Sequence, residues 1–273
     1  MAMALDLPHR EVTVDTPREE WLVRKYKVSM IRDVLIKHLN NLAATPSGRQ
    51  MRAMNRISML LANDRRPEIA NTMINWEADI PQISEDLDVL FFNGLVTRDG
   101  ITQFRPVIGG LPTAIPGFFF NGNTKYDCPG SGDITINFDT LEVGYLADTF
   151  PMNRVQRRSK ILGVLCHEMI HAFYMRYACQ EIECCLALDG EWSTLVHPRD
   201  GHGGAWVNVA KYINMLFVTM CPGLEITDSS GYLWWRPDPN GGLWTSYRDA
   251  LGVVENSVPG IIPADPFGLR GPP

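Results

Sequence analysis

The sequence has no excess of positive charge and no long apolar run. It contains 25 Lys and Arg against 31 Asp and Glu, and the net charge of -6 gives no overall attraction to nucleic acid, whose binders usually carry a basic face. No apolar run approaches the roughly 20 residues that a membrane-spanning helix needs. Residues 1–10 lack a cationic stretch followed by an apolar core, which excludes a secretory signal there. We therefore expect an intracellular protein, cytoplasmic or nuclear, that does not bind membranes.

Cysteine pairs separated by two residues are also absent, and this excludes a zinc ribbon. In a reducing compartment the expected state of the cysteines is a free thiol in the core. The alternative is an inhibitory thiolate or a redox switch at Cys166, beside His167, or at the adjacent Cys184 and Cys185. The six cysteines are Cys128, Cys166, Cys179, Cys184, Cys185 and Cys221.

Apolar residues at three- and four-residue steps predict a helical first third of the chain, and a β-prone stretch follows at 96–140. Within that stretch, residues 134–138 alternate apolar and polar side chains, which predicts a half-buried strand. Four cations within residues 154–160 indicate a solvated first helical turn. The helical spacing over 18–78 is broken at residues 45–48. After this break, helices are expected over 49–62 and from about residue 67. Further along the chain, helices are expected over 83–95, 154–178 and 206–220.

The segment from 167 to 171 reads His-Glu-Met-Ile-His on the helix predicted over 154–178. At about 100° per residue, His167 and His171 lie one turn apart on the same face, so both imidazoles can reach one ion. Glu168 is rotated about 100° from His167 and can reach a water molecule beside that ion. This pattern predicts a catalytic zinc site with Glu168 as the general base. The apolar stripe on the other side of the helix is expected to face the core, and consists of Leu162, Leu165, Met169 and Phe173.

A catalytic zinc ion takes three protein ligands, and the candidates for the third are His202, Glu191 and His197. His202 lies between glycines just before a predicted helix, where the backbone can approach a metal closely. A third histidine of the extended motif HExxHxxGxxH is excluded, because Tyr174 and Tyr177 stand at the required Gly and His positions. Spacing alone leaves the three candidates open.

Several segments together resemble the SprT-like (Spartan-like) family of zinc metallopeptidases. Residues 166–173 are similar to the metal-binding helix of that family, and residues 201–206, with Trp206 as the aromatic, are similar to its third-ligand motif. Residues 91–95 resemble its phenylalanine-glycine-leucine signature, and residues 132–141 resemble its edge strand. The resemblance covers about residues 80–220. It implies His167, His171 and His202 as zinc ligands and Glu168 as general base.

The fold that the resemblance implies is α+β and zincin-like, with a small sheet and the HExxH helix beneath it. Residues 1–78 would form a helical N-terminal region, 79–222 the zincin-like core, and 223–273 an aromatic Gly/Pro-rich segment that wraps the surface. Within this last segment, Tyr232, Trp234 and Trp235 either anchor the tail or line a substrate pocket. The acidic charge and the lack of a C-terminal zinc ribbon or a clamp-binding motif argue against DNA binding.

The implied activity is hydrolysis of a protein or peptide. Zinc would polarise the scissile carbonyl, and Glu168 would take a proton from water and return it to the leaving amine. The strand at 134–138 would pair with an extended substrate. One alternative keeps the zinc and acts on a small-molecule metabolite, in a pocket closed by residues 179–200. Another is a non-catalytic adaptor that keeps zinc for stability, although such a site has no need of Glu168.

Overall fold

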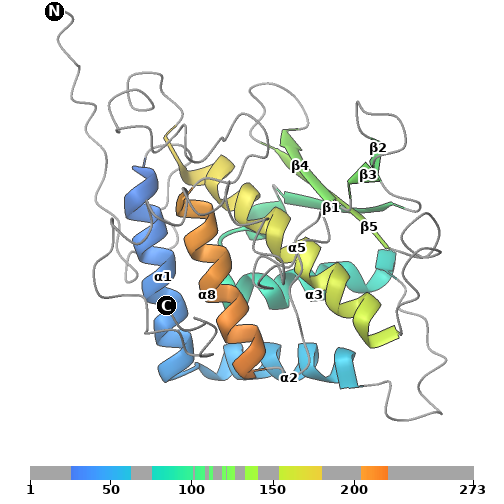
Figure 1. Cartoon of the computed structure of the whole chain (residues 1–273), viewed down its shortest axis with the longest axis horizontal. Helices are drawn as coiled ribbons and strands as arrows, with labels where there is room; N and C mark the ends of the chain where they lie inside the picture. The colour runs from blue at the N-terminus through green and yellow to red at the C-terminus, as the bar shows by residue number, and fades with distance from the viewer. Residues whose placement is uncertain are drawn as a thin grey trace, which may run out of the picture.

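The fold of the described residues is α+β, as the sequence predicts (Figure 1). A computed structural model describes residues 26–62, 76–100, 102–107, 111–112, 119–120, 122–126, 133–140, 154–179 and 204–220. Its elements in chain order are α1 (Val28–Ala44), α2 (Gly48–Ala62), α3 (Trp76–Phe91), the 3-10 turn η3 (Arg98–Gly100), β1 (Thr102–Val107), β2 (Leu111–Pro112), β3 (Phe119–Phe120), β4 (Gly122–Tyr126), β5 (Ile134–Asp139), α5 (Arg154–Tyr177) and α8 (Gly204–Met220).

The main sheet has three strands in the order β1–β5–β4. β1 runs parallel to β5 and pairs Thr102 with Ile134, whereas β4 runs antiparallel to β5 and pairs Gly122 with Phe138. β2 and β3 form a separate antiparallel pair. The predicted strand at 134–138 exists, but it is the central strand. The prediction that it is an edge strand able to pair with a substrate is therefore wrong, because both of its sides are already hydrogen-bonded.

The polar side chains on one face of β5 are shielded from solvent to different degrees: Thr135 is buried and Asn137 is half-buried. Thr135 and Asn137 alternate with the apolar residues, and this alternation predicted one solvated face. Thr135 is nevertheless fully buried, and Asn137 Nδ2 donates a hydrogen bond of 2.8 Å to Asn123 Oδ1 at the paired position of β4. The Asn137 amide thus has a hydrogen-bond partner on the neighbouring strand, in the place where a solvated strand face would offer water. The same alternation therefore fits a central strand.

Helix α5 contacts both the sheet and the other helices, and α3 also packs directly on β1. Helix α5 packs against β4 and β5, and also against α8, α2 and α3. The apolar stripe predicted on one side of the helix is buried, but every residue from 161 to 170 is buried too. Val164 and Tyr174, which the helical wheel puts beside the histidines, are 1% and 5% exposed. The helical wheel predicted one buried stripe correctly, but it did not predict that the middle of the helix, residues 161–170, is buried on all sides.

The N-terminal helices belong to the same hydrophobic core as α5 and α8. α1 and α8 run side by side (Figure 1). The predicted break is confirmed, because α1 ends at Ala44 and α2 begins at Gly48. The start of α1 is also tied to the end of α5: Tyr26 N donates to Tyr177 O at 3.3 Å, and Cys179 N donates to Tyr26 O at 2.8 Å. The boundary expected between residues 78 and 79 falls inside α3.

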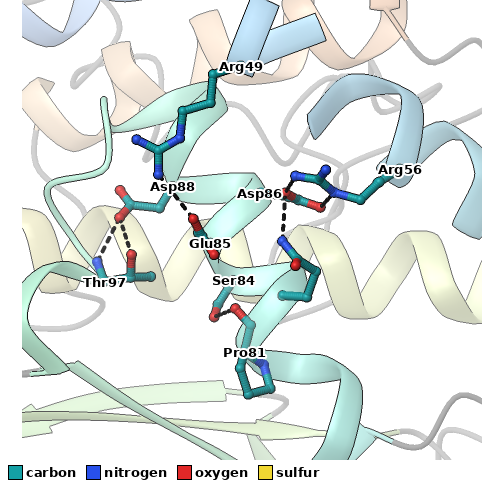
Figure 2. A network of polar contacts seen from close by, with 9 residues as sticks. Arg49, Arg56, Pro81, Ser84, Glu85, Asp86, Asp88 and Thr97 are labelled. Atoms are coloured by element: carbon teal, nitrogen blue, oxygen red, sulfur yellow. Dashed lines mark hydrogen bonds and ion pairs between the residues drawn. The ribbon is translucent and has the colours of Figure 1, made fainter. Parts of the chain in front are cut away.

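The observed bounds of α3 differ from the predicted helix over 83–95. The helix extends back to Trp76 and contains Pro81, which sequence patterns usually treat as a boundary. Arg56 Nε donates to Asp86 Oδ2 at 2.8 Å, so the middle of α3 is joined to α2 by an ion pair (Figure 2). The helix predicted to begin near Pro67 starts outside the described residues.

The turn after α3 ends that helix before residue 95. Asn93 and Gly94 have φ angles of 55° and 70°, and such left-handed residues terminate helices. Asp88 is fully buried and accepts hydrogen bonds from Val96 N at 3.0 Å and from Thr97 N and Oγ1 at 2.7 and 2.6 Å. Figure 2 shows Thr97 beneath this carboxylate. The segment with the phenylalanine-glycine-leucine signature is thus a helix end and a turn held by Asp88.

Arg158 corrects the prediction of a solvated basic turn at 154–160. Its side chain is 5% exposed, and Nη1 donates to Leu60 O at 2.8 Å in the last turn of α2. The guanidinium satisfies a carbonyl that the end of α2 would leave without an intrahelical partner.

None of the described helices is both long and apolar enough to cross a membrane. The C-terminal segment expected to wrap the surface, 223–273, lies outside the described residues.

Candidate metal centre

Two histidine side chains meet on one face of α5. The Nε2 atoms of His167 and His171 lie 3.3 Å apart, and the ring centroids are 5.0 Å apart. The helix brings them together because residues i and i+4 are neighbours on its surface. His167 is 4% exposed, while His171 is partly exposed and marks the side from which the pair is reached.

The distance between the two nitrogens fits a shared metal ion. Two imidazole nitrogens at 2.0–2.1 Å from a tetrahedral zinc ion are separated by roughly 3.3 Å. The same separation also permits an N–H···N hydrogen bond between two neutral rings, in which one ring donates and the other accepts. Either arrangement needs neutral imidazoles that point at one another, which is the state in which histidine binds metals.

Glu168 lies in the interior next to this pair. It is 3% exposed, and its Oε1 is 4.0 Å from His167 Nε2. The other oxygen, Oε2, accepts a hydrogen bond of 2.6 Å from Thr124 Oγ1 on β4. Burial raises the pKa of Glu168 from 4.5 to about 8, and the hydrogen bond from Thr124 opposes part of that rise. A carboxyl with a pKa near neutrality can both take up and release a proton under physiological conditions.

Trp206, from the first turn of α8, covers both imidazoles. Its ring centroid is 4.5 Å from that of His167, in an edge-on arrangement, and 5.4 Å from that of His171, nearly parallel. Tyr174 Oη donates to Ala205 O at 3.2 Å and fastens this turn of α8 to α5. The N-terminus of α8 is therefore held directly beside the histidine pair.

The candidates for the third ligand lie outside the described residues. These are His202, Glu191 and His197, and the vicinal cysteines and the aromatic tail are outside as well. Within the described ranges, no group of three or more His, Cys, Asp or Glu side chains could hold a metal ion. The structure thus brings together His167, Glu168 and His171 and does not describe the rest of the predicted site.

Cys166 and Cys179 are free and buried, which confirms that prediction for these two cysteines. Cys166 adjoins His167 in sequence and is 1% exposed. Burial raises the pKa of the Cys166 thiol well above its usual range. Because a thiol acts on metals and electrophiles as the thiolate, this environment favours a structural role over the redox role considered above.

No protein-family model, curated protein or solved structure matches this chain.

Three residues of the site were not assigned a role from sequence. Thr124 and Gly122 come from β4, and Trp206 was noted only as the aromatic of the third-ligand motif. A glycine within a strand does carry a signal, because it often marks a close approach of the backbone to another group. Here a Cβ added to Gly122 would lie 2.8 Å from Glu168 Oε1 and 2.7 Å from a methyl carbon of Val164.

Proposed function

We propose that this chain is a zinc-dependent metallohydrolase of the SprT-like, zincin-like type, and that it acts as a peptidase. The observation that carries the proposal is the meeting of His167 and His171 at an Nε2–Nε2 distance of 3.3 Å with the buried Glu168 beside them. A structural metal site has no need of such a carboxylate, which argues against the adaptor alternative.

His167, His171 and His202 would hold the zinc ion. In the sequence, His202 is two residues before Gly204, where α8 begins. Because Trp206 contacts both imidazoles, this end of α8 is beside the histidine pair. These contacts favour His202 over Glu191, which lies much farther from α8 in the sequence. When bound, zinc supplies a Lewis acid that polarises a carbonyl and makes water more acidic.

Glu168 is the proposed general base and acid. Its Oε1 faces the histidines, while its Oε2 is held by Thr124. In this role it removes a proton from the attacking water and delivers it to the leaving amine. Glu168 is 3% exposed, so bulk water is kept away from the carboxylate, which strengthens its interactions with nearby charges.

Strand β4 favours a peptide as the substrate. It passes directly over Glu168, and in the described part of the chain it pairs with β5 alone. The outer edge of β4 then offers backbone donors and acceptors next to the proposed catalytic group, and an extended peptide can add to such an edge as a further strand. The role first expected of residues 134–138 is thus transferred to 122–126.

The experiment is a metal analysis combined with activity assays on a panel of substrates. Wild type should contain one zinc per chain, and His171→Ala and His202→Ala should lose most of it. Glu168→Gln should keep the zinc and lose turnover by a factor on the order of 10²–10⁴. Glu85→Gln, a change of an exposed glutamate on α3, is the matched control and should behave as wild type.

The substrate panel separates the candidate functions. Cleavage of casein or of protein bound to DNA supports the peptidase, whereas turnover confined to small amides and esters supports the small-molecule alternative. Full activity in Glu168→Gln, or a gently purified wild type without zinc, would refute the metallohydrolase proposal.

A further inference from the structure

Strand β4 presents two residues to Glu168, at positions 122 and 124. Residues two apart in a strand point to the same side of a sheet, and this side of β4 packs on α5. Thr124 is paired with the buried Ile136 of β5, so its backbone is fixed by the sheet. The two positions therefore form a rigid surface against which the Glu168 side chain lies.

The two carboxylate oxygens of Glu168 have different surroundings. Oε2 is 2.6 Å from Thr124 Oγ1, a distance typical of a strong hydrogen bond between a hydroxyl and a carboxylate. Oε1 is 4.0 Å from His167 Nε2. The terminal torsion of a glutamate is broad and roughly two-fold, so without a fixed partner the two oxygens exchange places freely. The Thr124 hydroxyl supplies that partner for one oxygen.

Gly122 gives the carboxylate room to adopt this orientation. A Cβ at this position would lie 2.8 Å from Oε1 and 2.9 Å from the Cγ of Glu168, closer than real contacts allow. A side chain here would force Glu168 or Val164 to move. Gly122 thus leaves space for the Glu168 carboxylate beside β4, and the Thr124 hydroxyl binds one oxygen of that carboxylate.

We propose that Thr124 is a positioning residue for Glu168: it holds Oε2 against β4 and thereby directs Oε1 toward the metal-binding histidines. This inference rests on the proposed function for its catalytic consequence, but not for the contact itself. Misplacing a catalytic group by about 1 Å can cost on the order of 100-fold in rate. The Thr124 hydroxyl therefore contributes to turnover without touching the substrate.

The kinetic test replaces Thr124 by valine, which removes the hydroxyl but keeps the branched shape. Thr124→Val should lower kcat by about 10–100-fold, with KM and zinc content unchanged. Thr124→Ser retains the hydroxyl and should restore kcat to within about threefold. Thr102→Val is the matched control, because Thr102 is a buried threonine of β1 whose hydroxyl has no hydrogen-bond partner in the described part of the chain. A wild-type kcat in Thr124→Val overturns the proposal.

A second measurement does not depend on activity. In chelator-treated protein, Thr124→Val should lower the melting temperature by about 3–6 °C when residue 168 is glutamate. In a Glu168→Met background the hydroxyl keeps only its 3.0 Å hydrogen bond to the backbone carbonyl of residue 168, so the same change should have a smaller effect. Equal shifts in the two backgrounds overturn the inference even if the enzyme is active. A wild type without turnover on any substrate refutes the proposed function, while the melting data still test the contact.

Discussion

Replacing Glu168 by glutamine measures the cost of burying an ionisable side chain in α5. Burial raises the pKa of this carboxyl from 4.5 to about 8. Between these pH values the folded protein holds one more proton than the unfolded chain, so the free energy of unfolding falls as the pH rises through that window. The complete loss amounts to about 5 kcal/mol. Glutamine has no proton to lose, and Glu168→Gln should not show this fall.

The assay is urea unfolding of chelator-treated protein at several pH values between about 5 and 9. Subtracting the variant from wild type removes the contributions of His167 and His171, which are present in both. A change of up to about 5 kcal/mol is large against a typical total stability of about 5–15 kcal/mol. Glu85→Gln, at an exposed position, should leave the pH profile unchanged. Parallel profiles for wild type and Glu168→Gln would show that the carboxyl is not buried as described.

Two further predictions concern the surroundings of the site. Asp88→Asn should destabilise the fold by about 2–3 kcal/mol, because the amide cannot accept all three hydrogen bonds from Val96 and Thr97. Urea unfolding measures this loss, with Glu85→Gln as the control. Equal effects of the two changes would contradict the role given to Asp88. Cys166 should resist iodoacetamide in the folded protein even near pH 9 and react after denaturation, because it is buried and its pKa is raised. Mass spectrometry locates the label. Rapid labelling of Cys166 in the folded protein would refute the prediction.

The parts of the fold that depend on local periodicity could be predicted from the sequence. The bounds of α2, α5 and α8 agree with the predicted helices to within two residues. The meeting of His167 and His171 follows from the same period, because four residues make about one turn. Where the local signal is ambiguous the prediction failed: the helix expected over 83–95 begins at Trp76 instead and contains Pro81.

The parts that depend on contacts between distant segments could not be predicted. Alternation in residues 134–138 indicates a strand but does not say how many neighbours it has, and Asn123 supplies the polar partner from another strand. The same holds for Thr124, which meets Glu168 across 44 positions of sequence. Arg158 reaches Leu60 over 98 positions, so its charge gave no hint of burial. Such pairings are set by tertiary packing, which composition does not encode.

The pairing of α1 with α8 has a consequence for the order of assembly during synthesis. α1 is complete at Ala44, whereas α8 begins only at Gly204, so the ribosome releases the first helix long before the helix that covers it. Contacts between such distant segments slow folding, since the intervening chain must be ordered before they form. Until then the nascent chain exposes the apolar face of α1, including Leu35 and Leu39, and is open to association with other chains.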